Sequence, residues 1–186
     1  RLLSLSSRVS SIGSVRDFSA RVSVPGNDEI TDLATNVNSM LGELEKSQQH
    51  LQVRLNQSEE NYRLFFNSII DMVVVIHPGH DIVLAGPIIE ANVSAVELLG
   101  LSRSELGEIP FSSLVAPDDH PNVAEFLEKV RAGKSGQVES TYRTSNGLLI
   151  PVEMNVRSFD QFGQEALLVI ARDITERKAI ERLKIE

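Results

Sequence analysis

The chain has 186 residues and a formal net charge of −8, and its composition excludes several functions before any motif is considered. A strongly negative chain does not suit nucleic acid, because binding to phosphates requires clustered Lys and Arg side chains. The absence of cysteine excludes thiol catalysis, cysteine metal sites and cysteine-linked chromophores, and it fits a reducing compartment. No segment approaches the ~20 apolar residues of a membrane span, and a chain that begins with Arg1 is expected to be part of a longer protein.

The first part of the chain predicts two helices joined by a non-helical connector. Four apolar residues near the start recur at helical spacing: Leu2, Leu5, Val9 and Ile12. Gly13 is a suitable stop for this helix, and the connector continues to Pro25–Gly26. The second helix is expected to open at residues 27–29, where a capping side chain and acidic residues suit a helix N-terminus.

The second helix carries an apolar stripe with a seven-residue period. Every seventh position is apolar apart from one serine: Ile30, Val37, Leu44, Leu51, Ser58 and Phe65. Such a period predicts a helix that buries one seam against a partner helix. The steps from Met40 to Leu44 to Gln48 form a stutter, which unwinds a coiled coil locally. We expect the seam to contain apolar positions from both helices: Leu5, Val9, Ile12, Ile30, Leu33, Val37, Met40, Leu44, Leu51 and Leu55.

From Tyr62 the sequence changes to that of a globular body. A dense apolar helix precedes a β-branched run at Met72–Ile76, which predicts a buried strand, and the next strand is expected to begin at Ile82–Leu84. Residues 85–89 read as an insertion. Asn92 is expected to cap a helix that ends at Gly100 and buries Val93, Val96, Leu98 and Leu99. Ser102 and Glu105 then have capping-box spacing.

The last third predicts a longer helix followed by antiparallel strands. The helix opens at residues 118–121, stops at Gly133 and buries Val123, Phe126, Leu127 and Val130. Two strands with alternating side chains flank Asn146–Gly147, which is the strongest short hairpin signal. Their inward-facing positions are Val138, Ser140, Tyr142 and Thr144, then Ile150, Val152, Met154 and Val156. A loop at Asp160–Gly163 leads to a strand at Ala166–Ala171, and Asp173 and Glu176 have capping-box spacing for a final helix.

This order of elements, together with four segments, resembles a PAS domain. The segments are Glu60–Ser68, Glu97–Leu106, Val115–Asp119 and Asp173–Lys178. The resemblance covers residues 59–178 and implies an antiparallel five-stranded sheet with flanking helices. It also implies that Asp173 and Thr175 join the last strand to the outgoing helix through short side-chain hydrogen bonds, and so couple sheet motion to helix motion. A simple helix cap worth roughly 1 kcal/mol is compatible with that role.

Residues 1–46 resemble a HAMP domain, the parallel dimeric four-helix linker found just inside membranes in bacterial and archaeal receptors. The matching features include Gly13, the connector residues Phe18 and Val24, the Asp28–Glu29 pair, and Asn38 followed by Met40. The usual initial proline is not seen, and Thr31 stands where glycine is favoured. The resemblance implies that Glu29 packs against the end of the first helix and sets signal coupling. An acid at a helix N-terminus stabilises by roughly 0.3–1 kcal/mol in any case.

No histidine is assigned a chemical role. His77 and His80 flank a Pro-Gly turn beside Asp81, where exposed histidines are a better interpretation than a metal site. His120 lies beside two aspartates, but no nucleophile is near it in sequence, and the opening of a helix explains the group better. We therefore predict no catalytic, metal-binding or cofactor-binding residue.

The interior of the PAS-like region is the other candidate site. Some PAS relatives bind heme through a histidine inside the longer helix, but the inside of that helix here offers Val123, Ala124, Phe126 and Leu127. Photoactive flavin relatives need a cysteine, which this chain lacks. Seven side chains are candidates for lining a small apolar pocket: Ile76, Val83, Leu98, Phe126, Tyr142, Met154 and Val169. A solid core is the stronger alternative, because buried apolar faces normally pack against each other.

These observations predict an α+β multidomain chain. The expected parts are a HAMP domain at 1–46, a connecting coiled-coil helix at 47–58, a PAS domain at 59–178 and the start of an output helix at 179–186. The resemblances imply the cytoplasmic relay region of a homodimeric, membrane-anchored sensor, a histidine kinase of a two-component system. A transmembrane segment upstream and an output domain downstream would belong to the same chain, and this part has no activity of its own. The alternative is a PAS domain that itself detects a small apolar ligand.

Overall fold

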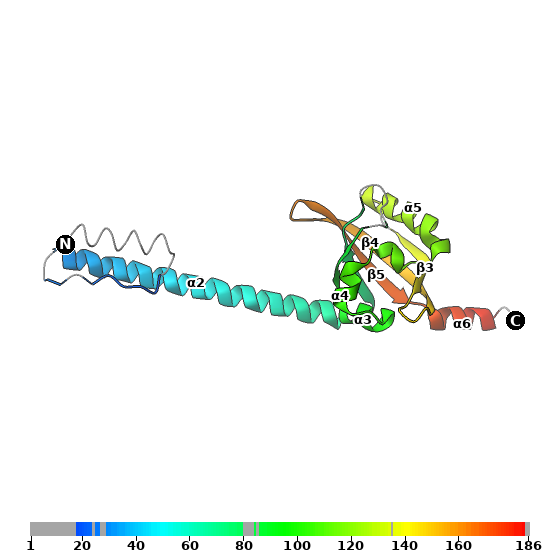
Figure 1. Ribbon diagram of the computed structural model, residues 1–186, viewed down its shortest axis with the longest axis horizontal. Helices are drawn as coiled ribbons and strands as arrows, with labels where there is room; N and C mark the ends of the chain where they lie inside the picture. Colours follow the sequence, from blue (N-terminus) through cyan, green and yellow to red (C-terminus); the bar gives the residue numbers. More distant parts are fainter. Residues whose placement is uncertain are drawn as a thin grey trace. The chain divides into compact units, whose positions relative to one another are not determined.

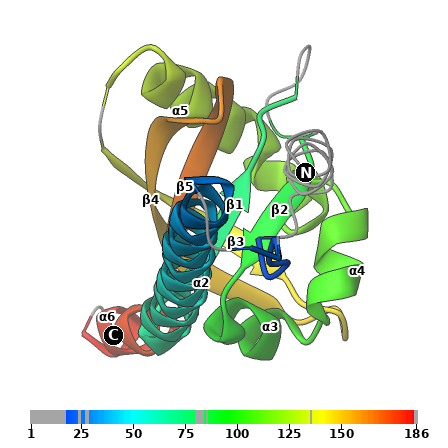
Figure 2. The same ribbon diagram turned by 90° about the vertical axis from the view of Figure 1, so that its left-hand side faces the viewer.

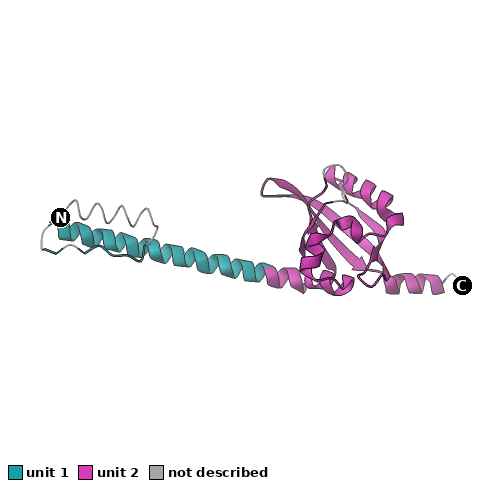
Figure 3. Ribbon diagram, viewed as in Figure 1, with its two compact units in different colours: residues 1–62 teal, residues 63–186 magenta. Residues whose placement is uncertain are grey.

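The computed structural model describes residues 18–23, 25–26, 29–79, 84, 86–134 and 136–184. Its contacts separate the chain into two compact units, residues 1–62 and residues 63–186 (Figure 3). The predicted first helix, its stop at Gly13 and the seam residues Leu5, Val9 and Ile12 lie outside the described residues.

The first unit contains most of the helix α2 (Glu29–Ser68), which is 40 residues long and unbroken. The expected stutter concerns the coiled coil between two copies and stays a prediction. The connector packs on α2 through a small buried cluster of Val22, Ala34 and Leu41. Asn38 fixes the connector backbone, because its side chain accepts from the Val22 N–H and donates to the Val22 carbonyl, both at 2.8 Å. Arg21 in the connector forms a 2.8 Å ion pair with Glu45 of α2.

The second unit contains a five-stranded antiparallel sheet in the order β2-β1-β5-β4-β3 (Figure 1). The strands are β1 (Met72–Ile76), β2 (Ile88–Ala91), β3 (Gln137–Arg143), β4 (Leu149–Gln161) and β5 (Gln164–Asp173). The first and last strands of the body are neighbours, and Met72 lies opposite Ala171 in their register. The sheet therefore brings the start of β1 and the end of β5 side by side, at one end of the central strands.

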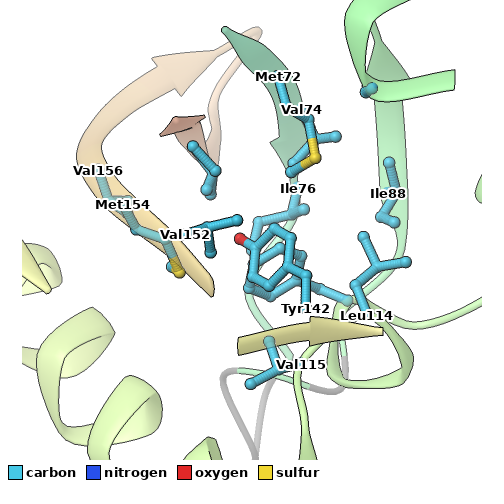
Figure 4. Close-up of a cluster of buried hydrophobic side chains, with 14 of the residues drawn as sticks. Met72, Val74, Ile76, Ile88, Leu114, Val115, Tyr142, Val152, Met154 and Val156 are labelled. Atoms are coloured by element: carbon cyan, nitrogen blue, oxygen red, sulfur yellow. The ribbon is translucent and has the colours of Figure 1, made fainter. Parts of the chain in front are cut away.

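Helices gather around one face of this sheet (Figure 2). They are α3 (Val93–Leu99), α4 (Arg103–Glu108), the short 3-10 turns η2 (Phe111–Ser113) and η3 (Pro117–Asp119), and α5 (His120–Arg131). The outgoing helix α6 (Thr175–Leu183) follows β5. The core between the sheet and α3–α5 is formed by apolar side chains such as Met72, Val74, Tyr142 and Met154 (Figure 4). This arrangement confirms the predicted PAS-type sheet with flanking helices.

Most predicted elements of this unit are confirmed, but the second strand is wrong. Ile82 and Val83 lie outside the described residues, and Leu84 lies in a 3-10 turn. The second strand is Ile88–Ala91, which begins inside residues 85–89, the segment interpreted as an insertion. Both segments are short apolar runs, so composition does not distinguish them. The pairing of Ile88 with Ile76, with Ile89 as the extra residue of a bulge in β2, selects the later run.

The hairpin between β4 and β5 also differs from the predicted loop. The strands continue to Gln161 and Gln164, and only Phe162 and Gly163 connect them, with φ of 54° and 82°. Two consecutive residues with positive φ are typical of a type I′ turn. At the β3–β4 hairpin the Asn-Gly signal is confirmed, but the loop is longer and only Gly147 has a positive φ.

Some predicted side-chain roles are corrected. In α3 the side chain of Val93 is 40% exposed, and Ala95 is buried in its place. In α5 Phe126 is only partly buried against the core. The side chain of Asp119 does not cap α5, because it accepts from the Thr141 N–H at 2.6 Å and so binds β3.

Candidate functional site

The junction between α2 and the PAS body is organised by Asn92, which is fully buried. Its Oδ1 accepts hydrogen bonds from the backbone N–H groups of Val73 and Ala95, both at 2.9 Å. Its Nδ2 donates to the carbonyl oxygens of Ile69 and Asp71 at 3.2 and 3.0 Å. One side chain thus caps α3 and holds the segment between α2 and β1. We call residues 67–73 together with Asn92 the incoming junction.

Two further side chains support the incoming junction. Asn67, in the last turn of α2, accepts from the Val93 N–H at 3.1 Å and from Arg103 Nη2 at 2.7 Å. The hydroxyl of Ser94 donates to the carbonyl of Ile69 at 2.7 Å. The end of α2 is therefore bound to both α3 and α4 by hydrogen bonds.

At the other end of the body, Asp173 connects β5 to α6. Its Oδ1 accepts from the backbone N–H of Thr175 at 2.7 Å and from the Thr175 hydroxyl at 2.5 Å. Between them Ile174 is buried, and its N–H donates to the carbonyl of Pro151 at 3.0 Å. The short Asp-Thr hydrogen bonds expected from the resemblance are therefore present. The predicted capping box with Glu176 is not, because Ile174 occupies the cap position.

Ion pairs attach α6 to the sheet. Glu139 on β3 and Glu153 on β4 are directly opposite each other. Like charges in that position repel, but Arg177 donates to both carboxylates, at 2.8 Å to Glu153. Lys178 adds a 2.5 Å ion pair to Glu139, and this hydrogen bond lowers the pKa of the Glu139 carboxyl. We call residues 173–178 with Glu139 and Glu153 the outgoing junction.

A further ion pair lies where the two junctions meet. The guanidinium of Arg172 donates from Nε and Nη2 to the carboxylate of Asp71, at distances of 3.0–3.3 Å. Asp71 immediately precedes β1 and Arg172 is the penultimate residue of β5. The bidentate geometry fixes orientation as well as distance.

The structure places the other predicted coupling residue, Glu29, at the exposed start of α2. Its expected contact, the end of the first helix, lies outside the described residues. The coupling roles of Glu29, Asp173 and Thr175 remain proposals.

The predicted seam divides into two groups on α2. Ile30 and Val37 pack against the connector cluster within one chain. The others leave their apolar side chains exposed by 42–63%: Leu33, Met40, Leu44, Leu51 and Leu55. The sequence missed Ala34 and Leu41, which are the buried positions of the connector face. The open group is available to a partner helix, whereas the connector group is already covered.

The candidate pocket residues belong to one hydrophobic core. Ile76, Tyr142, Met154 and Val169 are fully buried, Leu98 and Phe126 are partly buried against them, and Val83 lies outside the described residues. Figure 4 shows the Tyr142 ring among side chains of the sheet. Burial raises the pKa of the Tyr142 hydroxyl, which makes no hydrogen bond to any described residue.

Two of the described histidines, His77 and His120, have structural contacts. Nδ1 of His77 lies 2.9 Å from the Glu165 carbonyl oxygen. Nε2 of His120 lies 3.0 Å from the carbonyl oxygens of both Ser112 and Val115. Their neighbours His80 and Asp81 lie outside the described residues.

Several residues of the two junctions were not identified from the sequence. Asn92 was expected only as a helix cap, and Asp71, Arg172, Arg177, Glu139 and Glu153 were not singled out. Only Glu139 and Glu153 could have been inferred in part. The inward-facing positions of β3 and β4 were correctly predicted, so the alternation of side chains places these two acids on the opposite, outward face. Nothing in the sequence indicates that Asp71 and Arg172, separated by 101 positions, form a pair.

Comparison with known proteins gives two family matches. A HAMP domain model matches residues 1–46 and a PAS domain model matches residues 72–176, which is more than half of the chain. Among the described helices, none combines the length and apolarity needed to cross a membrane.

Several curated relatives are sensor kinases. The chain is 30% identical over 144 residues to sporulation kinase A of Bacillus subtilis, covering 75% of the chain and 22% of that kinase. It is 26% identical over 172 residues to the sensor histidine kinase WalK of the same species, covering 91% and 26%. The methyl sulfide methyltransferase-associated sensor of Methanosarcina acetivorans is 28% identical over 127 residues, covering 68% and 12%. The chain thus spans about a quarter or less of these relatives.

Solved structures agree on the fold. The PAS domain of an HTR-like protein from Haloarcula marismortui superposes with a TM-score of 0.58 at 23% identity, covering 68% of this chain and 99% of that domain. A PAS domain from Colwellia psychrerythraea gives 0.53 at 23% identity, covering 66% and 98%. The chain belongs to the PAS domain family, carries a HAMP domain before its PAS domain, and is homologous to sensor histidine kinases.

Proposed function

We propose that this chain is the relay region of a dimeric, membrane-anchored sensor histidine kinase. In this proposal the HAMP helices receive a conformational change from an upstream transmembrane segment. The change passes along α2 into the PAS domain and leaves through α6 toward a downstream kinase domain. This part of the protein has no catalytic role, and its cytoplasmic position follows from the same arrangement.

The observation that supports the relay most strongly is the unbroken helix α2. It begins within the HAMP match and ends four residues before the PAS strand β1. In proteins, most of the stability of a helix comes from packing of its apolar face and little from helix propensity, so an exposed helix lacks its main source of stability. A second copy covering Leu44, Leu51 and Leu55, which are 42–63% exposed, would supply the missing packing energy.

The dimer is tested by sedimentation equilibrium of the full chain. Leu51→Asp places a charge in the proposed seam, and we expect it to weaken dimerisation by at least about tenfold, since an unpaired buried charge is strongly unfavourable. Gln49→Asp is the matched control, because it adds the same charge to an exposed polar position of the same helix turn. If Leu51→Asp dimerises as strongly as the unmodified chain, the seam is wrong and the relay loses its physical basis.

A second candidate function is direct ligand sensing by the PAS core. One observation favours it: the buried Tyr142 hydroxyl makes no hydrogen bond to any described residue. A buried hydroxyl without a partner is unfavourable, and a bound molecule with a polar atom would satisfy it. Native mass spectrometry of purified protein tests this directly. A stoichiometric small molecule that is lost in Tyr142→Phe supports sensing, whereas a dimer mass with nothing bound contradicts it.

A further inference from the structure

The incoming and outgoing junctions lie at the same end of the two central strands β1 and β5. Because β1 and β5 are antiparallel neighbours with Met72 opposite Ala171, the residues just before β1 face those near the end of β5. A surface groove of about 660 Å³ is lined by both segments, including Ile70, Asp71 and Arg172. The end of α2 and the start of α6 are thus adjacent although more than a hundred residues separate them in the chain.

Each partner of the Asp71–Arg172 ion pair is linked closely to one helix. The backbone carbonyl of Asp71 accepts from the buried Asn92 side chain, which also binds Ile69 directly after α2. Arg172 is followed immediately by Asp173, whose carboxylate binds the first residue of α6. One bidentate ion pair therefore closes a short path from helix to helix.

The alternative path crosses the hydrophobic core. It would require movement of β1 against β5, whose inward side chains Val74, Val169 and Ala171 are fully buried. Protein interiors are close-packed, and displacing such side chains is expensive. The Arg172 side chain is 65% exposed, so the ion pair at the end of these strands can change its geometry without disturbing that packing.

We propose that the Asp71–Arg172 ion pair transmits displacement of α2 directly to α6, across the end of strands β1 and β5 instead of through the core. This inference rests on the relay proposed above and names the residues that carry it. Asp71 and Arg172 are positioning residues. Because an exposed ion pair contributes little to stability, their removal should impair transmission much more than folding.

The test uses the full chain with Leu55→Cys, whose single cysteine can be oxidised to link two copies through the proposed seam. Hydrogen exchange of the α6 amides, residues 175–183, is measured in the reduced and the oxidised protein. We expect linking to change the exchange rate of α6 by about threefold or more. In Leu55→Cys combined with Arg172→Gln or Asp71→Asn, we expect this ratio to fall to about one with the unfolding midpoint nearly unchanged.

Arg157→Gln is the matched control, since it neutralises another exposed arginine in the same sheet. The double charge reversal Asp71→Arg with Arg172→Asp should restore part of the response. If α6 responds to oxidation equally in the Arg172→Gln protein, the direct path is wrong while the relay stands. If no disulfide-linked dimer forms, or if α6 does not respond in the parent protein, the relay and the inference are both wrong.

Discussion

The two junctions of the PAS domain are built from different interactions. At the incoming junction Asn92 is fully buried and binds four backbone groups. At the outgoing junction α6 is attached through charged side chains, with Arg177 43% and Glu139 47% exposed. The first relies on neutral hydrogen bonds away from water, and the second on ion pairs in contact with it.

This difference determines how readily each junction can change. Removing a partner from a buried hydrogen bond costs about 1–3 kcal/mol, and salt has little effect on it. Exposed ion pairs contribute only about 0.2–1 kcal/mol each and are screened by salt. The end of α2 is therefore fixed to the PAS body, whereas α6 can be released at low cost. In the proposed relay, the end of α2 would thus receive the signal at a firmly held junction, and α6 would pass it on from a junction that is easily released.

The largest expected effect is at the incoming junction. Asn92→Ala removes the partner of the N–H groups of Val73 and Ala95 and of the Asp71 carbonyl, whereas the Ile69 carbonyl keeps the Ser94 hydroxyl. We expect the free energy of unfolding to fall by about 3 kcal/mol, measured by urea denaturation. Asn67→Ala, which removes a cap from the exposed N–H of Val93, should cost only about 1 kcal/mol. A loss below 1 kcal/mol for Asn92→Ala would show that this junction is not rigid.

The outgoing junction should respond locally. Arg177→Gln removes the cation that pairs with both Glu139 and Glu153, so their repulsion is offset only by Lys178 at Glu139. We expect amide exchange in α6 to accelerate by about fivefold, with a change in global stability below about 1 kcal/mol. Arg182→Gln, on the same helix, serves as the control. Equal exchange rates in the two variants would remove the role assigned to Arg177.

Salt should separate the two junctions in a single protein. Raising ionic strength from about 0.05 to 0.5 M shortens the screening length to a few ångströms. We expect exchange of the α6 amides to increase about twofold, while the amides of Val73 and Ala95 stay unchanged. A uniform response across both sites would indicate that they have the same physical origin.

The smallest effect is expected from pH. The hydrogen bond from Lys178 lowers the pKa of Glu139 below its ordinary value of 4.5. A carboxylate with a lowered pKa contributes its full stabilisation of the folded state at pH values above its ordinary pKa. This contribution disappears as the pH falls through the lowered pKa of the folded state. The α6 resonances in an NMR titration should therefore show the Glu139 transition centred below pH 4.5. A transition centred at or above pH 4.5 would contradict the Lys178–Glu139 pair.

The sequence predicted those parts of the fold that depend on local pattern. The alternation of residues 150–156 and the capping spacing of Ser102 and Glu105 are both confirmed. The PAS resemblance added the Asp173–Thr175 hydrogen bonds, which span two positions in the chain. These features are set within a few residues, so a single chain contains the information needed to infer them.

Features that depend on distant neighbours could not be predicted. The choice of Ile88–Ala91 as the second strand depends on its pairing with β1. The four contacts of Asn92 and the Asp71–Arg172 pair exist only once the sheet brings its first and last strands together. The two-residue turn between β4 and β5 could not be inferred either: it places Phe162 at a positive φ, which is uncommon for a bulky residue, and residues 160–163 were predicted only as a loop.

The central claim, transmission from α2 to α6, is tested most directly by changing the phase of α2. On a Leu183→Cys background, one alanine inserted after Ser58 rotates the following helix by about 100°, whereas a seven-residue insertion nearly preserves its phase. The measurement is the yield of disulfide between copies through residue 183. The account predicts that the seven-residue insertion keeps the parental yield and that the single alanine lowers it severalfold. Equal yields from the two insertions would contradict transmission through this helix.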